Sequence, residues 1–164
     1  MPRWYLLDDG PMSGARNMCR DEYIFGRVRE DPGMVILRTY AFDPPCISLG
    51  YHQKAEKVLD REAVSESGID LVRRITGGRA LLHQDEFTYC ITASSGGGSF
   101  GKGLGECFLR VAEVLIEALK TLGVEAELTG GRRDETPSGT ISPCLASVSR
   151  YEITAGGRKI VGSA

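Results

Sequence analysis

The sequence predicts an α+β fold, in which a mixed or antiparallel sheet is packed by helices. Two observations carry this prediction. Short apolar or alternating runs bounded by Gly, Pro and Asp are typical of strands, and they outnumber the helical stretches. These runs also lie mostly in neighbouring pairs along the chain, with few helices between them. Strands that follow one another in this way indicate an α+β arrangement.

Three helices are predicted. The first starts at about Ala15, and a short one covers Ala55–Ser67. The most regular opens near Leu104, and its apolar side chains recur at three- and four-residue steps as far as Leu122. Gly123 then supplies a helix stop. The strands are predicted at Val35–Tyr40, Cys46–Tyr51, Leu71–Ile75, Glu86–Thr92, Glu125–Leu128 and Arg150–Thr154, with a last one that starts at Arg158.

Composition predicts one domain over residues 1–164. A chain of 164 residues with 41% hydrophobic and 26% charged residues has the balance of an ordinary soluble domain. The net charge of -2, with acids and bases interspersed, gives no electrostatic footprint for nucleic acid or an anionic membrane. The first residues lack the apolar segment of a secretory signal, and no apolar run approaches the roughly 18 residues of a spanning helix.

The cysteines indicate a reducing, cytoplasmic environment. Their number, five, is odd, and no two of them form a CxxC pair. This pattern argues against a disulfide framework and against a zinc site. Free cysteine packs as a small hydrophobic side chain. We therefore expect a core position for four of them, Cys19, Cys46, Cys90 and Cys107.

A first candidate site is the run Arg73–His83, which reads RRITGGRALLH. A strand ends there in a Gly-Gly turn that is crowded by arginines, a threonine and a histidine. Consecutive glycines let backbone N–H groups approach an oxyanion or an extended chain closely, and arginines pair with phosphate or carboxylate. A surface turn with solvated arginines is the alternative, but the density of Arg, Thr and His favours a binding site.

A glycine-rich stretch, Gly96–Gly103, reads GxxxxGK between a predicted strand and a predicted helix. A phosphate-binding loop needs Ser or Thr at the next position, to hold magnesium, and here that position is Gly103. The stretch is therefore interpreted as a flexible connection, and neither a nucleotide nor a metal cofactor is predicted.

The last predicted hairpin places Lys159. Gly156-Gly157 occupies the two positions of a tight turn that need positive φ. With this turn, Thr154 lies opposite Lys159 and Ile153 lies opposite Ile160. Period-two alternation then separates Lys159 from the face of these two isoleucines.

Cys144 and Lys159 form a second candidate site. Cys144 follows Pro143 in a loop rich in Ser, Pro and Gly. By strand alternation, Lys159 shares a face with Glu152, Thr154 and Val161. A lysine ammonium near a cysteine stabilises the thiolate, which is the form that attacks thioesters, and can stabilise the resulting oxyanion. Residue types alone leave the pair open, because a loop cysteine is usually inert and a hairpin lysine usually solvated.

Four stretches of the chain together resemble the lipoate–protein ligase and octanoyltransferase family, which shares its catalytic fold with biotin–protein ligases. They occur in the family's order, and the runs RRxTGGRAxLH and GRKIxGSA are the most specific. The stretches are Gly14–Met18 with Asp21-Glu22, Tyr40–Tyr51, Arg73–His83 followed by Asp85–Tyr89, and Tyr151–Ile153 leading to Gly157–Ala164.

The resemblance implies a biotin/lipoate protein ligase-like catalytic domain and distinguishes its branches. The ATP-dependent ligases usually carry a third glycine where this sequence has Arg79. The TGGRA run, followed by an acidic residue and Thr-Tyr, is similar to the octanoyltransferase branch common in Gram-positive bacteria. That branch places a nucleophilic cysteine shortly before the YE…GRK hairpin, which implies Cys144 as the nucleophile and Lys159 as its partner.

The implied reaction moves an octanoyl or lipoyl-type group from an acyl carrier protein thioester to a lysine of a lipoyl domain, such as the glycine cleavage H protein, through a cysteine thioester. It requires no cofactor. An ATP-dependent lipoate–protein ligase and a non-catalytic acyl- or protein-binding module remain as alternatives. The implied substrate-binding residues are Arg73, Arg74, Thr76, Gly77, Gly78 and His83.

The family also implies more sequence than is present here. Its members continue well beyond the position of Ala164, with strands and a helix that close over the acyl group. We therefore expect the C-terminal part of the catalytic domain to be missing. The 164-residue chain alone should then be poorly active and self-associate, unless a second chain supplies the missing part.

Overall fold

The computed structural model describes residues 1–95, 100–101, 103–129 and 152–163. The chain divides into two compact units, Met1–Gly97 and Gly98–Ala164, and each unit is described by itself. Whether the whole sequence acts as one domain stays a prediction. Within the described ranges, no helix has both the length and the apolar character needed to cross a membrane.

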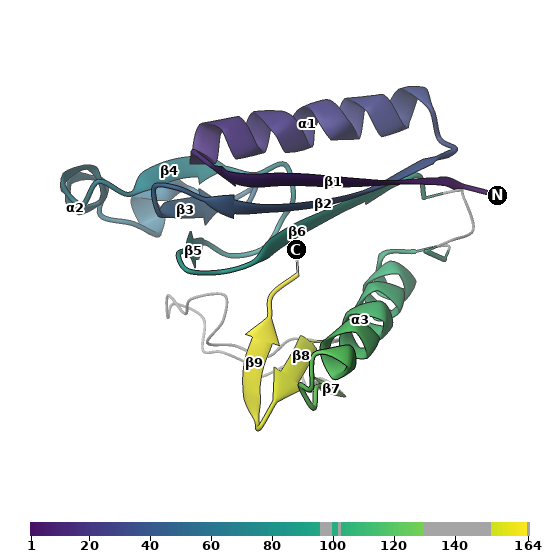
Figure 1. The fold of residues 1–164 in the computed structure, drawn as a ribbon. Helices are drawn as coiled ribbons and strands as arrows, with labels where there is room; N and C mark the ends of the chain where they lie inside the picture. The colour runs from purple at the N-terminus through teal and green to yellow at the C-terminus, as the bar shows by residue number, and fades with distance from the viewer. Residues whose placement is uncertain (96–99, 102, 130–151, 164) are drawn as a thin grey trace. The chain divides into compact units, whose positions relative to one another are not determined.

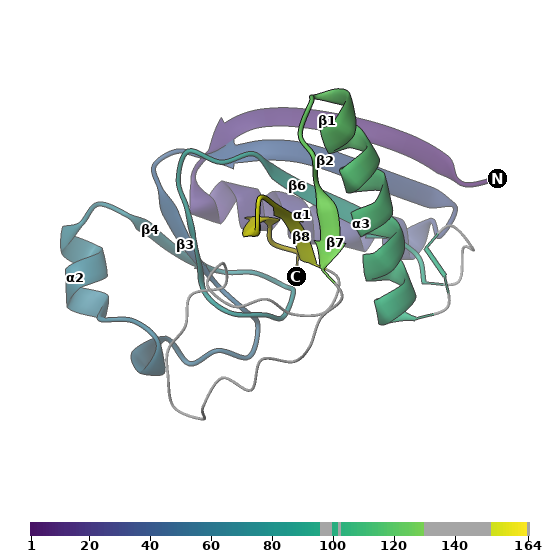
Figure 2. The same cartoon turned by 90° about the horizontal axis from the view of Figure 1, so that it is seen from below.

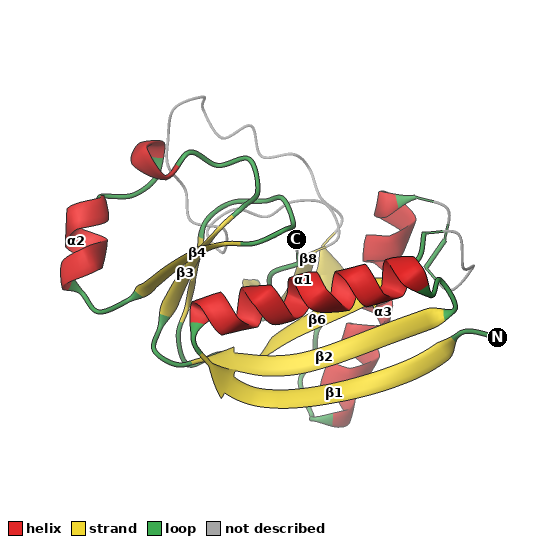
Figure 3. Ribbon diagram, turned by 90° about the horizontal axis from the view of Figure 1, so that it is seen from above, coloured by secondary structure: helices red, strands yellow, loops and turns green. Residues whose placement is uncertain are grey.

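The first unit contains a sheet with α1 along one face. Its strands are β1 (Arg3–Met12), β2 (Met34–Phe42) and β6 (Thr88–Ala93), in the order β1-β2-β6. β1 runs parallel to β2, and β6 runs antiparallel to it. Helix α1 (Gly14–Glu30) connects the two parallel strands and lies along the sheet (Figures 1 and 3).

Apolar side chains attach α1 to this sheet. Ile24 and Val28, one turn apart on the helix, pack against Ile36 of β2. The start of the helix is fixed by Asp70, whose carboxylate accepts a hydrogen bond of 2.8 Å from the Gly14 N–H. Gly14 also permits a close approach, because a Cβ there would lie 2.5 Å from the sulfur of buried Cys46.

A second sheet in the same unit carries the RRITGGRALLH run. Its central strand β3 (Cys46–Leu49) pairs in parallel with β4 (Asp70–Arg73) and antiparallel with β5 (Leu81–His83). The helix predicted over Ala55–Ser67 is wrong as a continuous element. It consists of a single 3-10 turn at Ala55–Lys57 and of the short α2, Arg61–Glu66, because the side chain of Asp60 caps a new start.

The second unit packs a helix against a small antiparallel sheet. Helix α3 (Leu104–Thr121) lies beside β7 (Glu127–Thr129), which pairs with β8 (Glu152–Ala155), and β8 pairs with β9 (Arg158–Val161) (Figure 2). The core of this unit contains mainly aliphatic side chains from the helix and the three strands. They are Ala112, Ala126 and Ile153, with Leu115, Ile116, Leu119, Val124, Leu128 and Val161 packed around them.

The mixed α+β class is confirmed, with three three-stranded sheets in the described residues. Each predicted strand has a counterpart, shifted at its ends by a few residues, and the predicted helices at about Ala15 and Leu104 are present. Two strands were missed. They are β1, which is ten residues long, and β5, which lies inside the run interpreted as a binding turn.

The last hairpin agrees with the prediction in part. Gly156 and Gly157 have φ of 55° and 74°, and Thr154 lies opposite Lys159 as predicted. The predicted pairing of Ile153 with Ile160 is wrong, because a register shift between Ile153 and Thr154 brings Val161 opposite Ile153 instead. Val161 therefore packs with Ile153, and its predicted place on the face of Lys159 is wrong as well.

Candidate functional site

The loop that follows β3 is held by the first arginine of the RRITGGRALLH run. The Arg73 Nη1 donates to three backbone carbonyls, those of Gly50 at 2.9 Å, Tyr51 at 3.1 Å and Gln53 at 2.6 Å. Carbonyl groups of an irregular loop have no strand partner, so a guanidinium that collects several of them fixes the loop. Arg73 thus organises the backbone beside the Gly-Gly turn.

The second arginine, Arg74, joins β3 to the turn itself. Its Nη1 donates to the carbonyl oxygen of Ser48 at 2.9 Å and to the Ser48 hydroxyl at 3.0 Å. Its Nη2 donates to the carbonyls of Gly77 and Arg79, both at 2.8 Å. The two arginines therefore bind the protein's own backbone, and their predicted contact with substrate stays a prediction.

Glycine is required where the turn meets the loop after β3. A Cβ on Gly50 would lie 2.0 Å from the carbonyl oxygen of Gly78, and Gly78 itself has a φ of 91°. The Tyr51 N–H also donates to the Thr76 carbonyl at 2.9 Å, which holds the loop after β3 against the turn. At Gly77, by contrast, a Cβ would meet no atom within 4 Å. The structure thus brings Thr76, Gly77 and Gly78 together with both arginines.

His83 lies at the end of β5 with both ring nitrogens engaged. Its Nε2 is 2.7 Å from the Ser48 hydroxyl, and its Nδ1 is hydrogen-bonded to the Glu86 carboxylate. The same Glu86 oxygen accepts a hydrogen bond of 2.9 Å from the Thr88 hydroxyl. The ring of Phe42 stacks on the imidazole at a centroid distance of 4.2 Å. Because His83 is only 6% exposed, its chemistry is decided by these neighbours.

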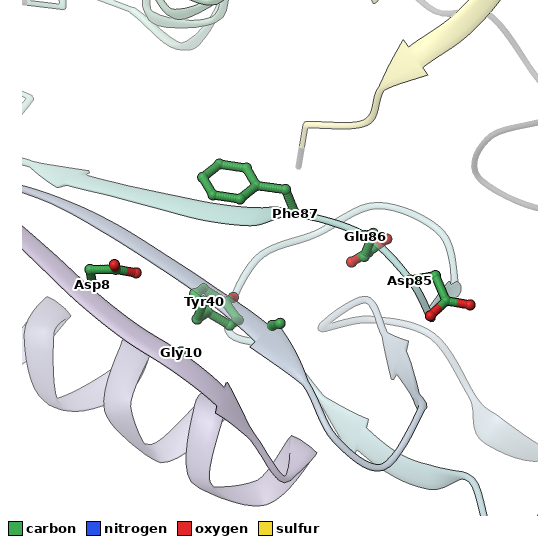
Figure 4. A pocket seen from close by; sticks show the side chains of 7 residues that line it. Asp8, Gly10, Tyr40, Asp85, Glu86 and Phe87 are labelled. Atoms are coloured by element: carbon green, nitrogen blue, oxygen red, sulfur yellow. The ribbon is translucent and has the colours of Figure 1, made fainter.

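An open cleft of about 400 Å³ lies in the first unit, beside Glu86. Tyr40 of β2, two positions on β1 and the β5–β6 loop form its walls (Figure 4). A neighbouring cleft of about 360 Å³ shares Glu86 and continues past Phe42. The lining residues of the first cleft are Asp8, Gly10, Tyr40, Ala41, Asp85, Glu86 and Phe87. Glu86 therefore connects the clefts with the His83 cluster.

A buried ion cluster next to this cleft was missed in the sequence. Arg38 on β2 is fully buried, and it forms ion pairs with Asp9 at 2.7 Å and with Asp21 at 2.6 Å. Its Nη1 also donates to the backbone carbonyl of Asn17 on α1 at 3.2 Å, and its Nη2 donates to the Asn17 side-chain oxygen at 2.6 Å. The sequence did contain a signal for this cluster, because Arg38 directly follows the apolar residues Met34–Leu37 in a predicted strand. An arginine that is buried in this way requires acidic partners.

The cluster also fixes Tyr40, one of the residues that line the cleft. The Tyr40 hydroxyl donates to Asp21 at 3.0 Å, and the Arg38 guanidinium lies 3.9 Å from the centroid of the Tyr40 ring. Burial, and next the charge of Asp21, raise the pKa of Tyr40 well above its usual range. The Tyr40 phenol is therefore neutral and acts as a donor at physiological pH.

Of the four cysteines with a predicted core position that the structure describes, Cys46 is buried and Cys90 and Cys107 are half-buried. Burial, and next the charge of Asp70, raise the pKa of Cys46 to about 12. Burial, and next Asp21, raise the pKa of Cys90 to about 11, and burial raises the pKa of Cys107. Such groups are thiols at neutral pH and poor nucleophiles. Cys19 is exposed on α1, so its predicted core position is wrong. The predicted nucleophile, Cys144, lies outside the described residues.

Lys159 of the second unit lies in a buried ion pair. Its Nζ is 2.5 Å from Glu152 Oε1, and the two side chains are 5% and 9% exposed. This pair confirms the predicted shared face of Lys159 and Glu152. Among the described residues, no group of three or more His, Cys, Asp or Glu side chains is arranged to hold a metal ion.

The chain is similar to known proteins over nearly its whole length. A family model described as the lipoyl protein ligase A/B catalytic domain matches residues 13–164. The octanoyltransferase LipM of Moorella thermoacetica is 46% identical over 161 residues, and the match covers 98% of this chain and 59% of that protein. The octanoyltransferase LipM of Carboxydothermus hydrogenoformans is 37% identical, and the match covers 100% of this chain and 60% of that protein.

A solved structure of lipoate-protein ligase A bound with ATP is also similar. Its TM-score is 0.73 at 28% identity, and the match covers 98% of this chain and 59% of that one. The chain thus spans about 60% of the length of the curated relatives it matches. On the family model, which covers nearly the whole sequence, the chain belongs to the lipoyl protein ligase A/B catalytic domain family.

Proposed function

We propose that the chain provides the catalytic domain of an octanoyltransferase, an enzyme that transfers an octanoyl group from an acyl carrier protein to a lysine of a lipoyl domain. The observation that carries this proposal is the 46% identity to an octanoyltransferase LipM over 98% of the chain. Within the family, the TGGRA run with Arg79 in place of a third glycine supports the same branch.

The proposed reaction has two acyl transfers. The Cys144 thiolate attacks the carbonyl carbon of the octanoyl thioester, and the carrier leaves as a thiol after it takes up a proton. The resulting thioester on Cys144 is then attacked by the neutral amine of the acceptor lysine. An amide forms, the amine loses a proton, and the Cys144 thiolate is released. Lys159 supplies the positive charge that favours the thiolate and the oxyanion of each step.

The Gly-Gly turn is proposed to bind the acyl donor near its carbonyl group. Backbone N–H groups of consecutive glycines can approach a carbonyl oxygen without obstruction by a Cβ. Arg73 and Arg74 support this role indirectly, since their bonds to loop and turn carbonyls hold the turn in place. We propose that Thr76, Gly77 and Gly78 contact the donor, and that Arg73, Arg74 and His83 contribute to its binding by holding this turn.

Intact-mass spectrometry tests the nucleophile. Incubation with octanoyl acyl carrier protein should add one octanoyl group to the chain, and hydroxylamine should remove it, because a thioester is sensitive to this reagent. Cys144→Ser should not form the adduct. Cys90→Ser is the matched control and should still form it, since the raised pKa of the half-buried Cys90 keeps this thiol protonated. An unchanged, hydroxylamine-sensitive adduct in Cys144→Ser would move the nucleophile to another residue.

An ATP-dependent lipoate–protein ligase is the second candidate. It is favoured by the similarity to lipoate-protein ligase A bound with ATP, at a TM-score of 0.73. In this reaction Lys159 contacts the phosphate and carboxyl region of a lipoyl-adenylate, the Gly-Gly turn holds the adenylate, and Cys144 takes no part. Pyrophosphate release separates the candidates. The octanoyltransferase releases none with ATP and free lipoate or octanoate, whereas lipoate-dependent release would establish the ligase.

A further inference from the structure

The hydrogen bonds around His83 have a defined direction, which starts at Arg74. A guanidinium can only donate, so the Ser48 oxygen is the acceptor in the 3.0 Å contact with Arg74 Nη1. The hydroxyl hydrogen of Ser48 is then available for its second close neighbour, His83 Nε2, at 2.7 Å. An imidazole nitrogen that accepts a hydrogen bond carries no proton. In this direction His83 holds its proton on Nδ1, and the Glu86 carboxylate on the other side of the ring decides between it and the reverse.

The other side of the ring agrees with this direction. His83 Nδ1 faces the carboxylate of Glu86, which accepts from the imidazole and from the Thr88 hydroxyl. The opposite tautomer would place an unprotonated Nδ1 against a carboxylate oxygen. A doubly protonated ring would bring a second cation to the Ser48 oxygen that already accepts from Arg74. The neutral Nδ1–H form gives both ring nitrogens of His83 and the Ser48 hydroxyl a matching partner.

Packing keeps this arrangement in a single geometry. Ser48 is 1% exposed and His83 is 6% exposed, and the Phe42 ring covers the imidazole. Cys46 and His83 are directly paired between β3 and β5, which puts Ser48, two residues further along β3, diagonally across from the histidine. The Glu86 side chain is 28% exposed and lines both clefts. Glu86 is thus the exposed end of a series of bonds whose other members are buried.

We propose that Glu86, His83, Ser48 and Arg74 form a one-directional hydrogen-bond relay that positions the Thr76–Gly78 turn. Arg74 is the first donor of this series and also holds the turn through the Gly77 carbonyl at 2.8 Å. Glu86 is accordingly a positioning residue for the acyl donor, and His83 acts through the turn. The effect on acyl transfer rests on the proposed function, whereas the relay itself can be tested without it.

Histidine NMR tests the direction of the relay. The chain has two histidines, so a spectrum of protein labelled with ¹⁵N-histidine contains two imidazoles, and His52→Gln identifies the signal of His83. At pH 7 the long-range ¹H–¹⁵N pattern should be that of the neutral Nδ1–H tautomer. A neutral Nε2–H tautomer or an imidazolium at His83 would overturn the proposal.

The reach of the relay is tested with amide spectra of variants. Glu86→Gln and Ser48→Ala should both shift the amide signals of Gly77 and Gly78, because each weakens the hold of Arg74 on the turn. The matched control is Glu66→Gln, which makes the same change on an exposed position of α2 and should leave both glycine signals in place. Glycine signals unchanged in Glu86→Gln would show that Glu86 does not act on the turn.

Kinetics separate positioning from a role in folding alone. With octanoyl acyl carrier protein, Glu86→Gln should raise KM roughly tenfold, the typical difference between a charged and a neutral hydrogen bond, and change kcat by less than about twofold. Thr88→Val removes a donor to Glu86 without a change in charge and should raise KM in the same direction. Partial misfolding would instead lower kcat through loss of active enzyme, with KM unchanged, and this result would overturn the positioning role.

The two proposals fail in different ways. If a chain that also carries the C-terminal part expected from the family forms no octanoyl adduct and transfers none, the proposed function is wrong, and the two NMR experiments still decide the relay. If octanoyl transfer proceeds and the KM of Glu86→Gln equals that of wild type, the proposed octanoyltransferase function is supported and the positioning role of Glu86 is refuted.

Discussion

Replacement of Arg38 by methionine should destabilise the first unit by about 3–5 kcal/mol at pH 7, the cost of removing one partner from a buried ion pair. The guanidinium is fully buried and binds two carboxylates, Asp9 at 2.7 Å and Asp21 at 2.6 Å. The side chains of these acids are 12% and 10% exposed, so water replaces little of the lost interaction. Methionine preserves much of the volume, and the loss is therefore mainly electrostatic.

The pH dependence of this loss has a defined sign. Burial raises the pKa of Asp9, but hydrogen bonds and charges of Arg38 and Arg20 outweigh it and hold the pKa below its usual value. A lowered pKa stabilises the folded state above the unfolded value of about 3.9, and this contribution is lost as the pH falls through the folded pKa. Without Arg38, the pKa of Asp9 rises. Protonation of Asp9 then removes the uncompensated buried negative charge that destabilises the variant. The difference in the free energy of unfolding between wild type and Arg38→Met should shrink as the pH falls from 7 toward 4.

Urea unfolding measures both effects. The single tryptophan, Trp4, lies on β1 and reports on the first unit. Arg27→Met is the matched control, because Arg27 forms an exposed pair with Glu30 whose loss should cost less than about 1 kcal/mol. A loss below about 1 kcal/mol in Arg38→Met, or a difference that widens on acidification, would refute the assignment of a buried, charge-compensating arginine.

Three further predictions concern the glycine contact, the thiols and the hairpin lysine. Gly50→Ala should destabilise the protein by about 1–3 kcal/mol and reduce octanoyl transfer, because its Cβ would overlap the Gly78 carbonyl. Gly77→Ala should cost less than about 0.5 kcal/mol in the same unfolding assay. A thiol reagent at neutral pH should modify Cys19 before Cys46 and Cys90, as peptide mapping would show. Lys159→Met should slow alkylation of Cys144 and shift the pH profile of alkylation upward, because a nearby cation no longer favours the thiolate. Identical profiles in wild type and variant would show that Lys159 does not act on Cys144.

The sequence predicted the elements that have a regular apolar pattern. Helix α3 has a regular helical period and strand β2 begins with a continuous apolar run, and both are present near the predicted bounds. β1 was missed because its second half reads Asp8-Asp9-Gly10-Pro11, a typical turn composition. The strand accommodates it through a register shift between Asp8 and Pro11, with Gly10 at a φ of 64°. Pairing with β2 and cover from α1, which no local pattern encodes, stabilise this strand.

The motif run located one part of the candidate site but not the role of its side chains. Arg73 and Arg74 were predicted beside the Gly-Gly turn, and both are there. Their acceptors include Ser48 and Gln53, which lie more than 15 residues away, on or after another strand. A guanidinium in a binding motif suggests an anionic ligand, whereas here it holds backbone carbonyls. Such a role depends on tertiary pairing and could not be inferred from the run alone.

Strand register explains why the relay around His83 is specific and why it was not predicted. Ser48 and Cys46 share one face of β3, and His83 is paired with Cys46 on β5. A slip of one residue would turn His83 to the other face of the sheet and separate it from Ser48. The hairpin of the second unit illustrates the same sensitivity, since one register shift replaces Ile160 by Val161 opposite Ile153. The chemical character of His83 therefore follows from a pairing that only the three-dimensional structure reveals.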